Sequence, residues 1–406
     1  MTKFPLSAST FPTLELPQKD IDEIEALSSL LVERTLIQYH EHEVVRRGVV
    51  DTTRWKKVTQ REDIKVFKER ASAAASSSTW SPDAATNSYG SVIPMLMSVG
   101  TISGDLFDVM YGVLSPTTEV MRIKSLHDED GLLDCRVLAT LINPSAEDPL
   151  RSLTLRWAAK GSPLIMTPVV RNRDVVYMES TGIAYTKSGE RIGYQLLHSV
   201  EVPGVPEFVE HQLVRAELSY CYIYRQKTAE IVDVFMRGVL DPRGGVPSYI
   251  GAISTAEALV AVSASAQCAE MKKLTWLLRT SKADPPSTLP DTSHCAVCLQ
   301  ATRLFNFKSM MKYSCAVCLE QICSKCCVTR KISYISPLNF NEVLQTKFPF
   351  CVRCVERALA KSAIEIATEE ASDPSLFNMS FGAMADIMSA PTSFSSTSSM
   401  AARTAS

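Results

Sequence analysis

The sequence lacks a strong net charge and any long apolar run. Its 42 lysines and arginines nearly balance 44 acidic residues, giving a formal charge of −2, so we expect no nucleic-acid partner recruited by a whole-chain field. No stretch of about eighteen uninterrupted apolar residues is present, which predicts no transmembrane helix. The first residues hold no basic segment followed by an apolar run, so we expect no secretory signal peptide and a cytoplasmic protein.

The patterns typical of catalytic sites are also missing. The six histidines form no HExxH motif, and no serine lies in a Gly-x-Ser-x-Gly elbow. No glycine-rich phosphate loop follows a predicted strand. We therefore expect a binding protein and no enzymatic activity.

The composition predicts a folded chain of several segments. Hydrophobic residues make up 46% of the 406 residues and charged residues 21%, as in globular proteins. A proline-rich stretch at 281–293 is typical of a linker, and the Ser/Ala/Met-rich residues 362–406 are predicted to be disordered. The predicted domains are therefore 20–280, after an N-terminal extension at 1–19, and 294–361.

Hydrophobic periodicity predicts an α+β fold for the first domain. Apolar residues spaced by three and four predict an amphipathic helix at 20–46 and a long closing helix at 247–278, with short helices at 105–113 and 117–125. Eight strands of one antiparallel sheet are predicted at 64–69, 92–102, 132–141, 153–160, 175–185, 191–202, 213–225 and 230–240.

One face of this sheet is predicted to enclose an apolar ligand with the closing helix. Alternation on the last strands places Tyr220, Tyr222 and Met236 on the inner face, and on the strand before them Tyr194 and His198. A lone histidine on an apolar face can also be a satisfied core residue. The alternate positions are expected to face solvent, namely Arg215, Glu217, Asp233 and Arg237.

Several of these segments resemble a known lipid-binding family. The runs Arg173–Tyr177, Val214–Arg215 and Val239–Pro247, the last leading directly into the long helix, resemble the closing half of a START lipid-transfer domain. The resemblance covers about residues 20–280 and implies a helix-grip fold, in which an antiparallel sheet grips a C-terminal helix around a lipid or other apolar ligand. The alternative is a START-like scaffold with no transported lipid.

Nine of the twelve cysteines lie between Cys295 and Cys354. Eight of them form four Cys-x-x-Cys pairs, and two tetrahedral zinc ions need eight such ligands. A disulfide framework is the alternative, but it conflicts with the absence of a signal peptide. His294 and Cys327 are left without a ligand role, and the predicted zinc ligands are Cys295, Cys298, Cys315, Cys318, Cys323, Cys326, Cys351 and Cys354.

The spacing of the pairs distinguishes among double-zinc folds. Four residues separate the second pair from the third, and the all-cysteine set resembles a FYVE domain, the endosomal phosphoinositide-binding zinc finger. That resemblance implies a cross-brace in which the first and third pairs share one ion and the second and fourth pairs share the other. A START-like domain followed by a FYVE-like finger is similar to START/FYVE proteins of oomycetes. A RING-like ubiquitin ligase or a PHD-like reader is the alternative.

The FYVE resemblance also implies contact with membranes. Met310 and Met311 occupy the loop that FYVE domains insert into lipid, unless both pack inside the finger. Of the family's basic stretch only Lys312 is present, so we expect peripheral, weak contact with anionic endosomal membranes and little choice among phosphoinositides. Ten basic and three acidic side chains in 294–361, together with two zinc ions on eight thiolates, leave about +3 for this attraction.

Overall fold

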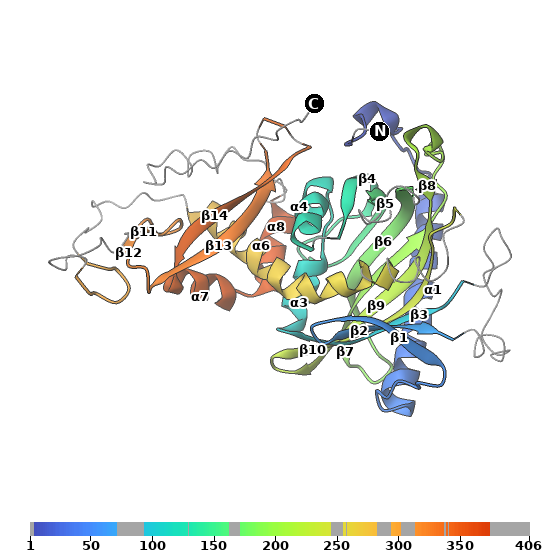
Figure 1. The fold of residues 1–406 in the computed structure, drawn as a ribbon, viewed down its shortest axis with the longest axis horizontal. Helices are drawn as coiled ribbons and strands as arrows, with labels where there is room; N and C mark the ends of the chain where they lie inside the picture. The colour runs from blue at the N-terminus through green and yellow to red at the C-terminus, as the bar shows by residue number, and fades with distance from the viewer. Residues whose placement is uncertain are drawn as a thin grey trace, which may run out of the picture.

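The chain forms an α+β fold in which one large sheet and a small cysteine-rich finger lie against each other (Figure 1). The computed structural model describes residues 4–70, 93–128, 130–161, 171–244, 255–256, 258–281, 294–301, 313–336, 338–339 and 341–373. None of the helices in these ranges is long and apolar enough to span a bilayer.

The large sheet is built from antiparallel neighbours. Its strands lie in the order β1 (Trp55–Arg61), β2 (Ile64–Glu69), β3 (Leu96–Ser103), β10 (Ile231–Asp241), β9 (Glu217–Thr228), β7 (Arg191–Ser199), β6 (Arg173–Tyr185), β5 (Ser152–Lys160) and β4 (Leu132–Ile142). The short strand β8 (Val214–Arg215) pairs in parallel with β6. The eight predicted strands are confirmed, with the seventh divided into β8 and β9.

Strand β1 is the one strand of this sheet that the sequence pattern did not predict. It lies at the sheet edge and is mostly exposed, with Trp55 as its only fully buried residue. Exposed, lysine-bearing edge strands show little apolar alternation, because solvent covers both of their faces.

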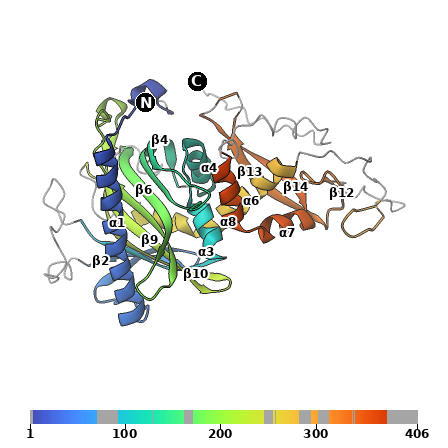
Figure 2. The ribbon, with the colours of Figure 1, turned by 180° about the vertical axis from the view of Figure 1, so that it is seen from behind.

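One face of the sheet is covered by the N-terminal helix α1 (Gln18–His40), which ends in a π-helical turn at Glu41–Val45 (Figure 2). This matches the predicted helix at 20–46. The ring of Tyr39 packs at 5.7 Å from that of Phe235 on β10, and Val32 is buried in the same core cluster. Residues of both α1 and the sheet therefore form one of the main cores.

The opposite face is covered by α3 (Leu106–Val113), α4 (Thr118–Asp128) and α6 (Ser265–Thr280). The closing helix predicted at 247–278 is not one continuous α-helix in its described part. A 3-10 turn at Val260–Ala264 precedes α6, and the Ser265 hydroxyl donates to the Val262 carbonyl at 2.8 Å. Serine side chains compete in this way for backbone groups and interrupt helices.

The finger contains two small hairpins and one helix. Strands β11 (Tyr313–Ser314) and β12 (Gln321–Ile322) form the first, and β13 (Cys327–Ile335) and β14 (Val343–Cys351) form the second. Helix α7 (Val352–Ala360) follows directly. The predicted linker lies outside the described residues apart from Ser281.

The expectation of disorder from residue 362 onward is wrong for its first part. Helix α8 (Ala363–Ser372) returns to the large domain and packs on α3 and α6 (Figure 2). Its residues Ala363, Ile366 and Ala367 are buried in the same cluster as α3 and the sheet. Two alanines and one isoleucine give a weak sequence signal, and the helix owes its place to tertiary packing. Residues 374–406 lie outside the described part.

Candidate metal centres and ligand-binding face

The first two cysteine pairs form matching turns. The backbone N–H of Leu299 donates to the Cys295 carbonyl at 2.8 Å, and that of Leu319 donates to the Cys315 carbonyl at 2.9 Å. Both leucines have positive φ, 58° and 61°, which lets the chain reverse just after the second cysteine of each pair. The two sulfurs of a pair are thereby brought to the same side of a tight turn.

The other two pairs lie where strands meet the following element. Cys323 and Cys326 lie between β12 and β13. Cys351 is the N-cap of α7, and its sulfur accepts the backbone N–H of Cys354 at 3.3 Å. Helix N-termini favour negative charge, so this position stabilises a thiolate.

The fold brings the four pairs together as two groups. Cys295, Cys298, Cys323 and Cys326 form one group, and their sulfurs all lie within 4.8 Å of one another. The second group is Cys315, Cys318, Cys351 and Cys354, and its sulfurs also lie within 4.8 Å of one another. The first pair thus joins the third and the second joins the fourth, which is the crossed arrangement that the FYVE resemblance implied.

The distances between sulfurs fit a tetrahedral zinc ion. Cys298 and Cys323 are separated by 3.8 Å and Cys318 and Cys351 by 4.0 Å. Zn–S bonds of about 2.3 Å in tetrahedral geometry place sulfurs about 3.8 Å apart. A disulfide needs about 2.05 Å, and the cysteines are free. Each group can hold one zinc ion through four thiolates, leaving no open position for a substrate.

Backbone donors and mutual repulsion decide how the thiols ionise without metal. Burial opposes ionisation of Cys295, but backbone N–H groups, including that of Cys323, bring its pKa down to about 6. Burial and the neighbouring thiols raise the pKa of Cys326 to about 12. Four adjacent thiolates are stable only beside a divalent cation, so these groups match the chemistry of structural zinc. His294 and Cys327 belong to neither group.

Three of the five residues predicted to face a ligand lie together on the α6 side of the sheet. Tyr222 and Met236 are buried and Tyr220 is half-buried. Tyr220, Tyr222 and Tyr224 form a row on β9, with neighbouring ring centroids 5.9 Å apart. The Tyr222 hydroxyl donates to the Leu259 carbonyl at 2.9 Å.

The prediction for Tyr194 and His198 is wrong, because both lie on the opposite, α1 side. Tyr194 pairs with Ile223 and His198 with Ser219 across β7 and β9, and directly paired residues share a face. His198 Nδ1 lies 2.8 Å from the Ser219 hydroxyl, and burial lowers the pKa of this histidine. Because helices cover both faces of the sheet, β7 carries apolar residues at odd and at even positions. The alternation of apolar and polar residues therefore does not show which side of β7 faces α6.

A buried polar group on the α6 side was missed by the sequence analysis. Arg156 on β5 forms an ion pair with Glu179 on β6, and both are at most 4% exposed. Gln195 on β7 donates to Glu179 at 3.1 Å and accepts the Tyr224 hydroxyl at 3.2 Å. An arginine within the apolar strand at 153–160 was the available signal, since a buried charge needs a partner.

The loop residues Met310, Met311 and Lys312 lie outside the described part of the chain. Membrane contact through these three residues therefore stays a prediction.

No protein-family model and no curated protein matches this sequence. Solved structures similar to the chain include human StAR-related lipid transfer protein 5, at 13% identity and a TM-score of 0.40, covering 61% of this chain and 97% of that one. Human STARD10 is similar at 14% identity and a TM-score of 0.36, covering 56% and 79%. A STAR-related lipid transfer protein from Xanthomonas axonopodis is similar at 15% identity and 0.35, covering 53% and 99%.

Proposed function

We propose that this chain is a non-enzymatic lipid-binding protein whose large domain takes an apolar ligand between the sheet and α6. The row of Tyr220, Tyr222 and Tyr224 supports this proposal most directly. The hydroxyls of Tyr222 and Tyr224 are hydrogen-bonded within the protein. That of Tyr220 forms no hydrogen bond with any described residue, and burial raises its pKa. The half-buried ring of Tyr220, with its unused hydroxyl at the end of the buried row, suits an apolar molecule that carries a polar head.

The test is lipid extraction from the purified, zinc-loaded full chain, followed by mass spectrometry. We expect a bound lipid in the wild type and its loss in Tyr220→Glu, because a charge would be buried against the ligand. Tyr185→Glu is the control, since Tyr185 is 63% exposed on β6. Wild-type protein that yields no lipid from any source, or equal recovery from both variants, would leave a START-like scaffold without a transported lipid.

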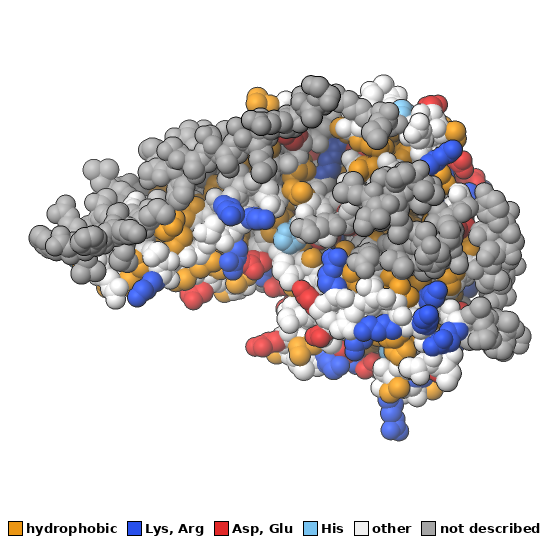
Figure 3. Space-filling view, viewed as in Figure 1, with side chains coloured by type: hydrophobic (Ala, Val, Ile, Leu, Met, Phe, Trp, Pro, Cys, Tyr) orange, Lys and Arg blue, Asp and Glu red, His pale blue; other side chains and the backbone are white. Residues whose placement is uncertain are grey.

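For the finger we propose a FYVE-like role as a membrane adaptor at endosomal membranes. The crossed grouping of eight cysteines supports it. So does the outer face of the β13–β14 hairpin, where exposed Lys331 and Lys347 lie directly opposite each other. Several lysine and arginine side chains gather over this hairpin (Figure 3). Like charges placed opposite each other are unfavourable by themselves and are relieved by an anionic surface.

Flotation of the full chain with liposomes tests this role. We expect weak, salt-sensitive binding to anionic vesicles, with little preference for phosphatidylinositol 3-phosphate. Lys331→Gln should reduce flotation, whereas Lys19→Gln on α1, where the side chain is 83% exposed, should not. Absence of flotation at every composition would favour the alternative, a RING-like or PHD-like protein-interaction finger.

A further inference from the structure

Three exposed valines lie close together in the chain where the N-terminal helix ends. Val44 and Val45 belong to the π-helical turn that closes α1, and Val49 follows four residues later. Their exposed fractions are 59%, 70% and 66%. Single exposed apolar side chains are common on protein surfaces, but a group of them marks an interaction surface. We call residues 44–49 the valine turn.

The valine turn is held in shape by its own backbone. The N–H of Gly48 donates to the His42 carbonyl at 2.9 Å. The N–H of Val49 donates to the Arg46 carbonyl at 3.0 Å. Arg47 and Gly48 have positive φ, 53° and 71°, and these conformations reverse the chain. A defined turn therefore sets the exposure of the valines.

The valine turn also lies at an outer edge of the large domain. Figures 1 and 2 show the end of α1 extending beyond the strands of the sheet, away from the finger. Hydrophobic side chains lie beside lysine and arginine side chains at this projecting end (Figure 3). The valines are therefore presented outward from the described structure.

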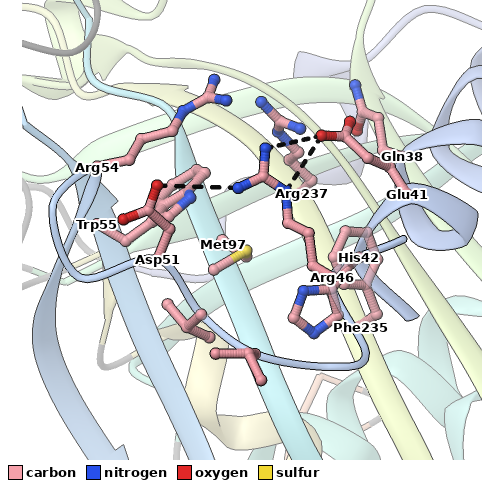
Figure 4. Close-up of a pocket in the computed structure, with 12 residues that line it drawn as sticks. Gln38, Glu41, His42, Arg46, Asp51, Arg54, Trp55, Met97, Phe235 and Arg237 are labelled. Atoms are coloured by element: carbon pink, nitrogen blue, oxygen red, sulfur yellow. Dashed lines mark hydrogen bonds and ion pairs between the residues drawn. The ribbon is translucent and has the colours of Figure 1, made fainter. Parts of the chain in front are cut away.

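The acidic side chains that flank the valine turn in the chain pair with arginines. Arg46 contacts Glu41 at 2.9 Å and Asp51 at 3.8 Å, as the dashed lines in Figure 4 show. Glu43 pairs with Arg225 on β9 at 2.6 Å. These three carboxylates are therefore neutralised within the protein.

Two exposed cations near the valines, Arg47 and Lys57, form no ion pair with any described residue. Arg47 lies within the turn itself. Val49 lines the same small cavity as Trp55 on β1, and Lys57 lies two residues further along that strand, on the same face. Exposed apolar side chains next to exposed cations match the two attractions of an anionic lipid surface, which are apolar burial and charge.

We infer that the valine turn docks on an anionic lipid bilayer, with its three valines in the apolar part of the interface and Arg47 against the lipid phosphates. This goes beyond the proposed function, because it gives the large domain a membrane contact of its own, separate from that of the finger. A second copy of the chain fits this surface less well. A stable contact between two proteins buries about 1,600 Å², more than three valines offer, and a symmetric pair would bring two Arg47 side chains together.

Flotation of the zinc-loaded full chain tests the surface, with vesicles of phosphatidylserine and phosphatidylcholine compared with phosphatidylcholine alone. The double variant Val44→Ser/Val45→Ser should lower the partition constant on anionic vesicles about tenfold, because its side chains lose the gain from leaving water. Val209→Ser is the matched control and should change nothing. Val209 is 62% exposed in the turn before β8, which lies at the other end of α1 in Figure 1.

The charge of the turn is tested by Arg47→Gln. This variant should lower the partition constant on anionic vesicles about fivefold at low salt and by less at high salt. Lys19→Gln, in the first turn of α1, is the control and should leave it unchanged. Binding to both kinds of vesicle that Arg47→Gln does not alter would contradict the anionic surface.

Lys331→Gln in the finger separates this surface from the proposed role of the finger. If both surfaces bind, the valine and lysine substitutions act independently, and their fold-changes multiply when combined. Loss of binding in Lys331→Gln with none in the double valine variant would overturn this inference and leave the finger role in place. The converse pattern would remove the finger role alone.

Two further results would count against the inference. One is a wild type that binds neither kind of vesicle. The other is a dimer, seen by sedimentation equilibrium without vesicles, that the two valine substitutions dissociate. That dimer would assign the valine turn to a second copy of the chain.

Discussion

Among single residues, Glu370 is a buried carboxyl group that affects how α8 packs on the large domain. It lies on α8, 6% exposed, and accepts a hydrogen bond from the Tyr111 hydroxyl on α3 at 3.0 Å. Burial, together with the repulsion of Glu369, raises its pKa to about 7, against the attraction of Lys272 and Arg279 on α6. The docking of α8 on the large domain is therefore tied to the protonation of one carboxyl group.

We predict that α8 docks more tightly in mild acid. Because the pKa in the folded state lies above the usual value of 4.5, the stabilisation is complete below pH 4.5 and is lost as the pH rises through about 7. The full difference is about 3 kcal/mol. Hydrogen exchange of residues 363–372 at pH 5.5 and pH 8, corrected for the intrinsic rate, measures about 2 kcal/mol of this difference.

Glu370→Gln should make this protection nearly independent of pH. Glu365→Gln is the control, since that carboxylate is 61% exposed and should leave the pH dependence unchanged. Equal protection of wild-type α8 at both pH values would contradict the prediction.

At the scale of elements, α6 is the helix that contributes residues to the cores of both the large domain and the finger. Ala269 lies in the core cluster of the sheet and α3, whereas Met271, Leu274 and Leu278 lie in the core cluster of the finger. An ion pair between Arg330 and Glu270, at 2.6 Å, adds a polar contact between β13 and α6. One helix thus fills two cores, which explains why it is buried nearly all round.

We predict that Gly112→Ala destabilises the protein by about 2 kcal/mol or more, because overpacking at a helix contact forces the backbones apart. A Cβ at Gly112 on α3 would lie 1.9 Å from the backbone carbonyl oxygen of Ser265 at the start of α6. In a helix without this contact, replacing glycine by alanine stabilises the protein by up to about 1 kcal/mol. A loss of stability in Gly112→Ala would therefore indicate the close contact between α3 and α6.

Urea unfolding gives the comparison. Ser29→Ala on the exposed side of α1 should change the free energy of unfolding by less than about 0.5 kcal/mol. A Gly112→Ala variant as stable as the wild type would show that α3 and α6 do not approach so closely.

For the whole molecule, the finger and the large domain share a core cluster in the described part of the chain. The sequence predicted two domains joined by a linker. Ile123 of α4 and four leucines and methionines of α6 pack with Ile332, Tyr334 and Phe350 of the finger, and α8 returns to α3. We therefore expect loss of metal from the finger to reach the helix that closes the large domain.

We predict that Cys315→Ser loses one of two zinc ions and also weakens hydrogen-exchange protection in α6. Structural zinc contributes folding free energy of about 10 kcal/mol in small fingers. Met271, Leu274, Leu277 and Leu278 of α6 lie in the core cluster of the finger. Metal analysis combined with hydrogen exchange provides the measurement. Cys327→Ser, which removes a cysteine outside both groups, should retain two zinc ions and full protection, and α6 unchanged in Cys315→Ser would mean that the domains fold independently.

The sequence by itself determined eight strands of the large sheet, the first helix and the eight cysteines that form the two groups. Local periodicity fixes a strand or a helix, and the two-residue spacing of a cysteine pair fixes its geometry within a few bonds. Only the tertiary structure decided which face each residue occupies and what covers it. It placed Tyr194 and His198 on the α1 side, left Arg237 half-buried beside the ring of Trp55, and packed α8 against α3 and α6. The physical reason is that burial and pairing depend on residues distant in the chain, which no local pattern records.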